Sequence, residues 1–128
     1  MTEFIEKLRF NADGLIPAIA QQWDSGEVLM MAWMSKKTLL KSLKQKKAIY
    51  YSRSRQLEWR KGDTSGNTQI IREIRVDCDT DCILLLVDQT GAACHENTRS
   101  CFTKLLSETG ITDNAKTAYP TLRITKEF

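Results

Sequence analysis

Apolar residues occur along the chain in short blocks that are separated by polar or glycine-containing turns. Residues 16–23 form the first of these blocks, and the turn signal Asp24-Ser25-Gly26 separates it from a second apolar block at residues 28–34. Short apolar blocks bounded by turn residues are typical of β-strands. The pattern therefore predicts a β-hairpin near the start of the chain.

The next segment has helical periodicity. Ser35 is a good N-cap residue, and Leu39, Leu40 and Leu43 then recur at the spacing of one helix face, while lysines occupy the positions between them. This spacing predicts one amphipathic helix over residues 35–46, with the leucine stripe in the core and the lysines in solvent.

Four further blocks predict short strands, because they are rich in β-branched or aromatic residues and are separated by turns. Their sequences are AIYYSRS, LEWRKG, QIIREIRVDC and ILLLVDQ. A turn is expected at residues 88–91, residues 100–108 fit a strand or a helix, and the polar chain beyond Gly110 is expected at an edge or as a loosely packed terminus. The expected fold class is α+β, dominated by short strands with about one helix.

Length and composition favour a single domain over residues 1–128. The chain has 128 residues, of which 41% are hydrophobic and 27% charged, and its formal net charge is +3. Such a chain can bury a core, and its mild positive charge permits an anionic ligand without requiring nucleic acid. No apolar run approaches the roughly 20 residues that span a bilayer. The first ten residues lack the apolar core of a secretory signal, so we expect a cytoplasmic protein.

The hexapeptide DCDTDC, which begins at Asp77, combines ligands that prefer different metals. Carboxylates suit Mg²⁺ or Ca²⁺, whereas thiolates suit Zn²⁺. On an extended backbone the side chains of Asp77, Asp79 and Asp81 would point to one face, and those of Cys78 and Cys82 to the other. This alternation makes two separate sites geometrically natural, although three such acids also fit a solvated loop without an ion.

The four cysteines are expected as thiols in a reducing cytoplasm. Thiolates of Cys78, Cys94 and Cys101 could bind zinc and leave a fourth position for water, as in catalytic sites. A fourth ligand from Cys82 would close the site as structural zinc, but the apolar strand after Cys82 favours an inert buried thiol. The single histidine, His95, follows Cys94 and could transfer protons near neutral pH, or could be an ordinary hydrogen-bonding residue.

A basic stretch rich in hydroxyls lies between the helix and the aspartates. It contains Arg53, Arg55, Arg60 and Lys61, followed by the polar residues 63–67. Guanidinium groups, hydroxyls and backbone N–H groups can together bind phosphate, although an exposed basic hairpin without a ligand fits the same composition. A small zinc-stabilised RNA-binding module could also use this stretch and its aromatic residues, but the neighbouring carboxylates would repel a polyanion.

Five segments taken together resemble one enzyme family. They are GLIPAIAQ, GEVLMMAWM, YYSRSRQLEWRKGDTSGNTQ, DCDTDC and ACHENTRSC, and they span about residues 14–102. In this order and spacing they are similar to the stand-alone form of phosphoribosyl-AMP cyclohydrolase. That family opens the adenine ring of 1-(5-phosphoribosyl)-AMP at the N1–C6 bond, in the third step of histidine biosynthesis. Departures from its usual pattern, at Trp33, Gln56 and Glu58, affect no expected ligand.

The resemblance implies a zinc- and magnesium-dependent hydrolase that acts on a small nucleotide and contacts neither nucleic acid nor a membrane. It implies an intertwined homodimer with a partly barrel-like sheet and a zinc site shared between subunits. The residues that correspond to the metal ligands are Cys78, Cys94 and Cys101 for zinc, and Asp77, Asp79 and Asp81 for magnesium.

His95 is expected to transfer protons during attack by a zinc-activated water. The substrate phosphates are expected to be bound by the basic stretch and the loop after it. The expected substrate-binding residues are Arg53, Arg55, Lys61, Thr64, Ser65, Gly66 and Asn67.

Overall fold

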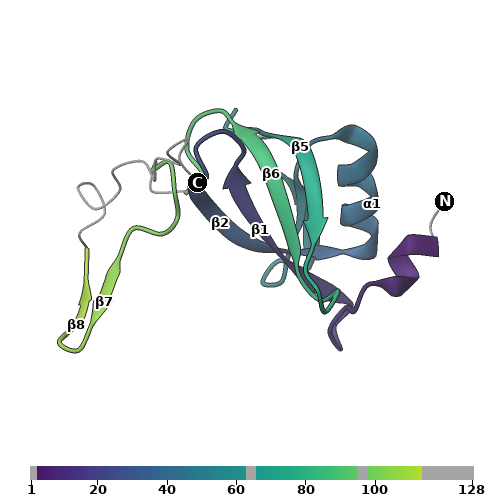
Figure 1. The fold of residues 1–128 in the computed structure, drawn as a ribbon, viewed down its shortest axis with the longest axis horizontal. Coiled ribbons are helices and arrows are strands. Elements are labelled where there is room, and N and C mark those ends of the chain that lie inside the picture. Colours follow the sequence, from purple (N-terminus) through teal and green to yellow (C-terminus); the bar gives the residue numbers. More distant parts are fainter. Residues whose placement is uncertain (1–2, 63–65, 95–97, 114–128) are drawn as a thin grey trace.

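The computed structural model describes residues 3–62, 66–94 and 98–113, and within them a curled six-stranded sheet carries one α-helix (Figure 1). The order of strands in the sheet is β4-β3-β2-β1-β6-β5, with β1 and β6 parallel and the other neighbours antiparallel. The elements are η1 (Glu3–Lys7), β1 (Leu15–Gln22), β2 (Val28–Ser35), α1 (Lys36–Gln45), β3 (Ile49–Ser52), β4 (Leu57–Arg60), β5 (Gln69–Val76), β6 (Ile83–Gln89), β7 (Leu105–Ser107) and β8 (Gly110–Thr112).

The α+β class and the first hairpin are confirmed. β1 pairs with β2 from Leu15 opposite Ser35 to Gln21 opposite Val28, and the register shifts once, after Ala20. The four strands predicted after the helix are also present as β3 to β6. The turn expected at residues 88–91 begins later, because β6 continues to Gln89.

The predicted helix is confirmed, and its start follows from a capping box. The Thr38 N–H donates to Ser35 Oγ at 3.1 Å, while the Ser35 N–H donates to Thr38 Oγ1 at 2.9 Å. Both bonds satisfy N–H groups that the helix itself cannot pair. The helix ends at Lys46, which has a left-handed φ of 58°.

The leucine stripe of the helix is only partly in the core. Leu39 is buried and Leu40 packs against the core, whereas Leu43 is 38% exposed, which corrects the expectation for that residue. Ser42 takes part in the buried face instead. Its hydroxyl donates to Thr38 O and accepts from the Ile49 N–H at 3.0 Å, so the helix can approach β3 with this polar group satisfied.

The sheet curls because the segment before β3 pairs with the start of β5. The Ala48 N–H donates to Gln69 O at 3.0 Å, and the Ile71 N–H donates to Lys46 O at 2.8 Å. This contact brings the two halves of the sheet together as a half-barrel around a core that includes Leu29, Tyr50 and Leu85. The partly barrel-like expectation is therefore confirmed.

Residues 100–108 fitted either a strand or a helix, and the structure has a strand there, β7, at Leu105–Ser107. It pairs with β8, and this two-stranded arm projects away from the main sheet (Figure 1). Leu106 and Ile111 pair with each other and are 81% and 67% exposed. No helix among the described residues is long and apolar enough to span a membrane.

We predict that Ser35→Ala lowers the free energy of unfolding by about 1 kcal/mol, because it removes the acceptor for the Thr38 N–H. Urea unfolding measures the effect. Lys37→Ala is the matched control, since Lys37 is exposed in the same first turn and has no capping role. An equal loss in both variants would contradict the role of the cap.

Candidate functional site

Asp77, Asp79 and Asp81 gather in the turn between β5 and β6. A carboxylate oxygen of each lies within 4.8 Å of those of the other two, and all three residues are exposed. The expected extended backbone is wrong here, because residues 77–82 form a turn in which Thr80 has a left-handed φ of 59°. The carboxylates therefore converge through chain reversal, and three such oxygens match the ligands that Mg²⁺ or Ca²⁺ prefers.

Hydrogen bonds within this turn separate the pKa values of its carboxyls. Desolvation acts to raise the pKa of Asp77, but hydrogen bonds from Asp81, Cys82 and Thr80 outweigh it and lower that pKa. The backbone N–H groups of Asp81 and Cys82 donate to Asp77 Oδ1 at 3.0 and 3.2 Å. The pKa of Asp81 is raised by its hydrogen bond to Asp77, by desolvation and by the charges of Asp77 and Asp79. A bound cation would relieve this repulsion.

The two thiols of the same turn differ in their surroundings. Cys78 is exposed, whereas Cys82 is half-buried and its Sγ lies 3.9 Å from Ile83 O. Burial raises the pKa of Cys82, and the charges of Asp77 and Asp81 act in the same direction. Cys82 thus favours the protonated thiol, although it is less buried than expected.

Cys94 and Cys101 lie beyond the opposite end of β6. The Cys101 N–H donates to Leu29 O of β2 at 2.7 Å, and the Cys94 N–H donates to Thr98 O at 3.2 Å. Burial lowers the pKa of Lys61, while the charges of Cys101 and Cys94 act to raise it. Lys61 Nζ donates to Ala92 O at 3.3 Å, two residues before Cys94, so its ammonium lies at the same end of β6 as both cysteines.

One chain does not bring Cys78 to this pair. β6 separates Cys78 from Cys94, and its seven residues span about 23 Å at the usual rise per residue. Among the described residues, the aspartates are the only group of three or more candidate ligands whose donor atoms converge. A site that uses Cys78, Cys94 and Cys101 would need a second copy of the chain.

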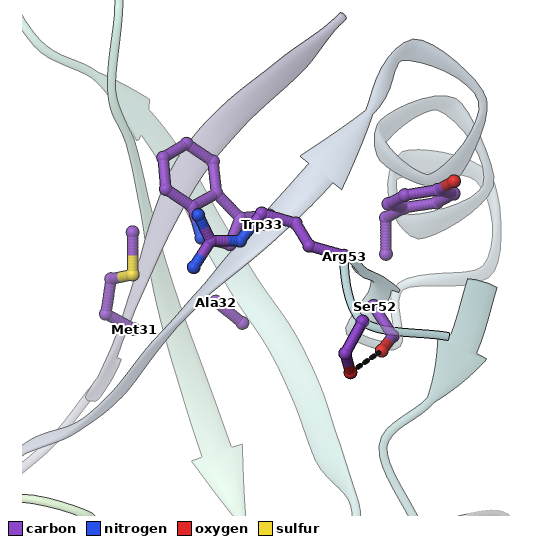
Figure 2. A pocket seen from close by; sticks show the side chains of 7 residues that line it. Met31, Ala32, Trp33, Ser52 and Arg53 are labelled. Carbon is purple, nitrogen blue, oxygen red and sulfur yellow. Dashed lines mark hydrogen bonds between the residues drawn. The ribbon is translucent and has the colours of Figure 1, made fainter. Parts of the chain in front are cut away.

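The first part of the basic stretch borders an open groove between β2 and the β3–β4 turn. Figure 2 shows the Arg53 side chain reaching across to Trp33, with its guanidinium carbon 4.7 Å from the ring centroid. The hydroxyls of Ser52 and Ser54 lie 3.3 Å apart beside it. The groove has a volume of about 590 Å³ and is lined by Met31, Ala32, Trp33, Tyr51, Ser52, Arg53 and Ser54. It offers a cation, hydroxyls and an aromatic face.

The second part of the stretch lies elsewhere. β4 separates Lys61 from Arg53 and Arg55, and Lys61 Nζ donates to Ala92 O at 3.3 Å, beside the thiol pair. Asn67 lies against Gly91, and a Cβ atom added at Gly91 would clash with the side-chain oxygen of Asn67. Gly66 is described next to it, whereas the expected site residues Thr64, Ser65 and His95 lie outside the described residues.

Sequence reasoning missed a set of polar side chains around the thiol pair, namely Gln22, Glu27, Tyr50, Gln69, Gln89 and Arg99. Of these, Gln69 is fully buried and Gln89 is 4% exposed. Strand parity could have revealed Gln89, because it falls on the same face of β6 as the buried residues Ile83, Leu85 and Val87. A polar residue at an inward position needs a hydrogen-bonding partner.

Burial raises the pKa of the Tyr50 hydroxyl far above its ordinary value, and the charge of Cys101 adds to this effect. The hydroxyl therefore remains a hydrogen-bond donor, and it donates to Gln69 Oε1 at 2.6 Å.

The chain is similar to known proteins over most of its length. The family model for phosphoribosyl-AMP cyclohydrolase matches residues 30–103. A phosphoribosyl-AMP cyclohydrolase of Rhodospirillum rubrum is 60% identical over 103 residues, which cover 80% of this chain and 72% of the relative. One of Haloquadratum walsbyi is 57% identical over 107 residues, covering 84% and 81%.

A histidine biosynthesis bifunctional protein of Prochlorococcus marinus is 55% identical over 107 residues, which cover 83% of this chain but 47% of that protein. Residues 30–103, which the family model matches, contain every candidate metal ligand described above. On this similarity, the chain belongs to the phosphoribosyl-AMP cyclohydrolase family.

Proposed function

We propose that the chain hydrolyses the N1–C6 bond of the adenine ring of 1-(5-phosphoribosyl)-AMP to give the formimino aminoimidazole carboxamide ribotide of histidine biosynthesis. The observation that best supports this proposal is the family match over residues 30–103, which include each proposed metal ligand and His95. The aspartates lie at one end of β6 and Cys94 and Cys101 at the other, which supports two metals of different character.

Asp77, Asp79 and Asp81 would hold Mg²⁺ at the β5–β6 turn. Their three converging carboxylate oxygens fit a hard cation, which would offset the repulsion among the three charges. A divalent ion there would neutralise phosphate charge on the substrate.

Cys94 and Cys101 of one chain, with Cys78 of a second copy, would hold Zn²⁺ in a homodimer. Three thiolates suit this metal and leave a fourth position open. Zinc in such a position lowers the pKa of water toward neutrality. Lys61, whose ammonium lies at the same end of β6 as Cys94 and Cys101, would offset part of the negative charge of the thiolates.

His95 is assigned to proton transfer. Substitution at N1 makes C6 of the ring electrophilic, so the oxygen of water bonds to C6, the N1–C6 bond breaks, and C6 becomes the carbon of a carboxamide. His95 would accept a proton from the water and deliver one to the departing N1. All atoms of water remain in the product, and no group leaves.

Arg53 and Arg55 would bind substrate phosphate at the groove beside β2. Guanidinium groups and the hydroxyls of Ser52 and Ser54 are suited to phosphate oxygens, and Trp33 offers an aromatic face to a base or ribose. Lys61 and Asn67 would contact the substrate nearer the thiol pair. Thr64, Ser65 and Gly66 are also assigned to substrate binding.

The first test of the function is the ultraviolet spectrum of phosphoribosyl-AMP, which ring opening must change. We expect the change with the wild-type protein and with Cys82→Ala, and background rates after chelation or with Cys94→Ser, because serine is a poorer zinc ligand. Full activity in a zinc-free preparation would reject the proposed chemistry. RNA binding with a steep salt dependence, and no spectral change, would favour the RNA-binding alternative.

The shared site is tested by refolding Cys78→Ala together with Cys94→Ala in the presence of zinc. Each variant alone lacks one ligand at every site, but a mixed dimer would have one complete site. Random pairing of equal amounts should restore roughly a quarter of wild-type activity. Differently tagged chains verify the mixed dimer, and a verified mixed dimer without zinc or turnover would reject sharing between subunits.

Asp81→Asn tests the carboxylate site. We expect it to weaken binding of Mn²⁺, used as a probe for Mg²⁺, by roughly tenfold, because one charged ligand is lost. Wild-type binding should also weaken as pH falls, since Asp81, with its raised pKa, takes up a proton that competes with the cation. Calorimetric titration measures both effects. Asp13→Asn, at an exposed turn outside the cluster, is the control, and equal affinities in the two variants would contradict the site.

A further inference from the structure

A chain of buried hydrogen bonds connects the core to the segment that carries the thiols. This segment, the thiol loop, consists here of residues 91–94 and 98–101. Tyr50 donates to Gln69 Oε1 at 2.6 Å, and Gln69 Nε2 donates to Gln89 Oε1 at 2.8 Å. Gln89 Nε2 then donates to Gly91 O at 3.1 Å and to Arg99 O at 2.8 Å. The three side chains form a relay that ends on both arms of the thiol loop.

The relay has one direction. The carbonyls of Gly91 and Arg99 can only accept, so the amide nitrogen of Gln89 must face them and its oxygen faces Gln69. The nitrogen of Gln69 therefore donates to Gln89, and its oxygen is left to accept from the Tyr50 hydroxyl. No buried side-chain nitrogen or oxygen among the described residues lacks a partner, so a flip of either amide would break satisfied bonds at both of its ends.

A second set of contacts holds the same loop from its outer side. The Arg99 guanidinium donates to Gln89 O at 2.9 Å and to Gln22 Oε1 at 2.8 Å, and its Nε lies 3.4 Å from the buried carboxylate of Glu27. Arg99 is thus fixed through its side chain, while its carbonyl accepts from Gln89. The two arms of the loop are tied to each other and to β6.

Cys94 and Cys101 are the residues that this arrangement positions. Cys94 lies on the first arm, three residues after Gly91, and its N–H bonds to Thr98 O on the second arm. Cys101 lies two residues after Arg99, and its N–H bonds to Leu29 O of β2. Fixing Gly91 and Arg99 at one amide group therefore limits how far the two sulfurs can separate.

We propose that Tyr50, Gln69 and Gln89 are positioning residues that hold Cys94 and Cys101 as a preformed pair of ligands for a soft metal ion. This inference rests on the zinc site of the proposed function. Metal sites depend on the partners that orient their ligands, and loss of such partners typically weakens metal binding by 10- to 100-fold. Gln89 acts through the loop backbone, and it need touch neither metal nor substrate.

The test uses the full-length protein and Cd²⁺ alone, with binding followed by the absorbance of cadmium–thiolate bonds. Gln89→Met and Gln69→Met keep the length of the side chain but remove its donor, and each should weaken Cd²⁺ binding by roughly tenfold or more. Tyr50→Phe removes a single hydroxyl and should weaken binding in the same direction by less. Mn²⁺ binding at the aspartate turn, which lies at the other end of β6 from Gln89, should be unchanged in all three variants, which a general loss of structure would not allow.

Gln21→Met is the matched control. The Gln21 amide also donates to a backbone carbonyl, Gly26 O at 2.9 Å, but in the β1–β2 hairpin, so its loss should leave Cd²⁺ binding unchanged. Folded Gln89→Met and Gln69→Met variants with wild-type affinity for Cd²⁺ would overturn the relay. If both fail to fold, unchanged affinity in Tyr50→Phe overturns it. A wild-type protein that binds no Cd²⁺ through its thiols overturns the proposed zinc site and the inference with it, an outcome distinct from failure of the relay alone.

Discussion

β6 pairs with β1 on one side and with β5 on the other, and this pairing positions every candidate ligand of the chain. β6 carries Ile83, Leu85 and Val87 into the core, so its position and direction are fixed by burial. One end of the strand follows the aspartate turn, and the other leads into the thiol loop. The aspartates and Cys78 therefore lie at one end of this rigid element and Cys94 and Cys101 at the other, so one chain cannot bring the aspartates to Cys94 and Cys101.

The curl of the sheet brings β3 close to β5, although the two strands are not neighbours in the sheet. Because the segment before β3 pairs with the start of β5, Tyr50 of β3 and Gln69 of β5 come within hydrogen-bonding distance inside the half-barrel. The register of β5 and β6 then places Gln69 opposite Gln89. A series of hydrogen-bonded side chains thus crosses the end of the apolar core and reaches the thiol loop. Because each buried amide has hydrogen-bonding partners, its burial costs little free energy of folding.

Charge is distributed differently at the two ends of β6. The aspartate turn concentrates negative charge in solvent. Hydrogen bonds lower the pKa of Asp77 there, while the hydrogen bond to Asp77, desolvation and the neighbouring charges raise the pKa of Asp81. The thiol end has a partly buried cation, Lys61, and the two sulfurs of Cys94 and Cys101. The first arrangement favours a hard divalent ion, and the soft sulfurs of the second favour a soft ion such as Zn²⁺.

Most elements of the fold could be predicted from the sequence, because their signals are local. Alternation and turn residues predicted β1 to β6, and Ser35 followed by helical spacing predicted α1. The family resemblance also rested on local motifs, and they identified the aspartates and cysteines as candidate ligands. The alternation of side chains along β6 also indicates that Gln89 points inward, as Ile83, Leu85 and Val87 do. Its hydrogen-bonding partner could not be predicted in the same way, because Gln69 lies 20 positions earlier in the chain.

Features that depend on contacts between distant segments could not be predicted from local patterns. The aspartates converge because residues 77–82 reverse direction, and not because an extended backbone alternates. Leu43 is exposed because the sheet contacts the face of Thr38, Leu39 and Ser42 instead. Lys61 lies beside the thiol loop because the sheet curls, whereas its sequence neighbours Arg53 and Arg55 lie beyond the other end of β4. Local patterns specify the conformation of a segment, but the burial of one segment against another decides which side chains meet.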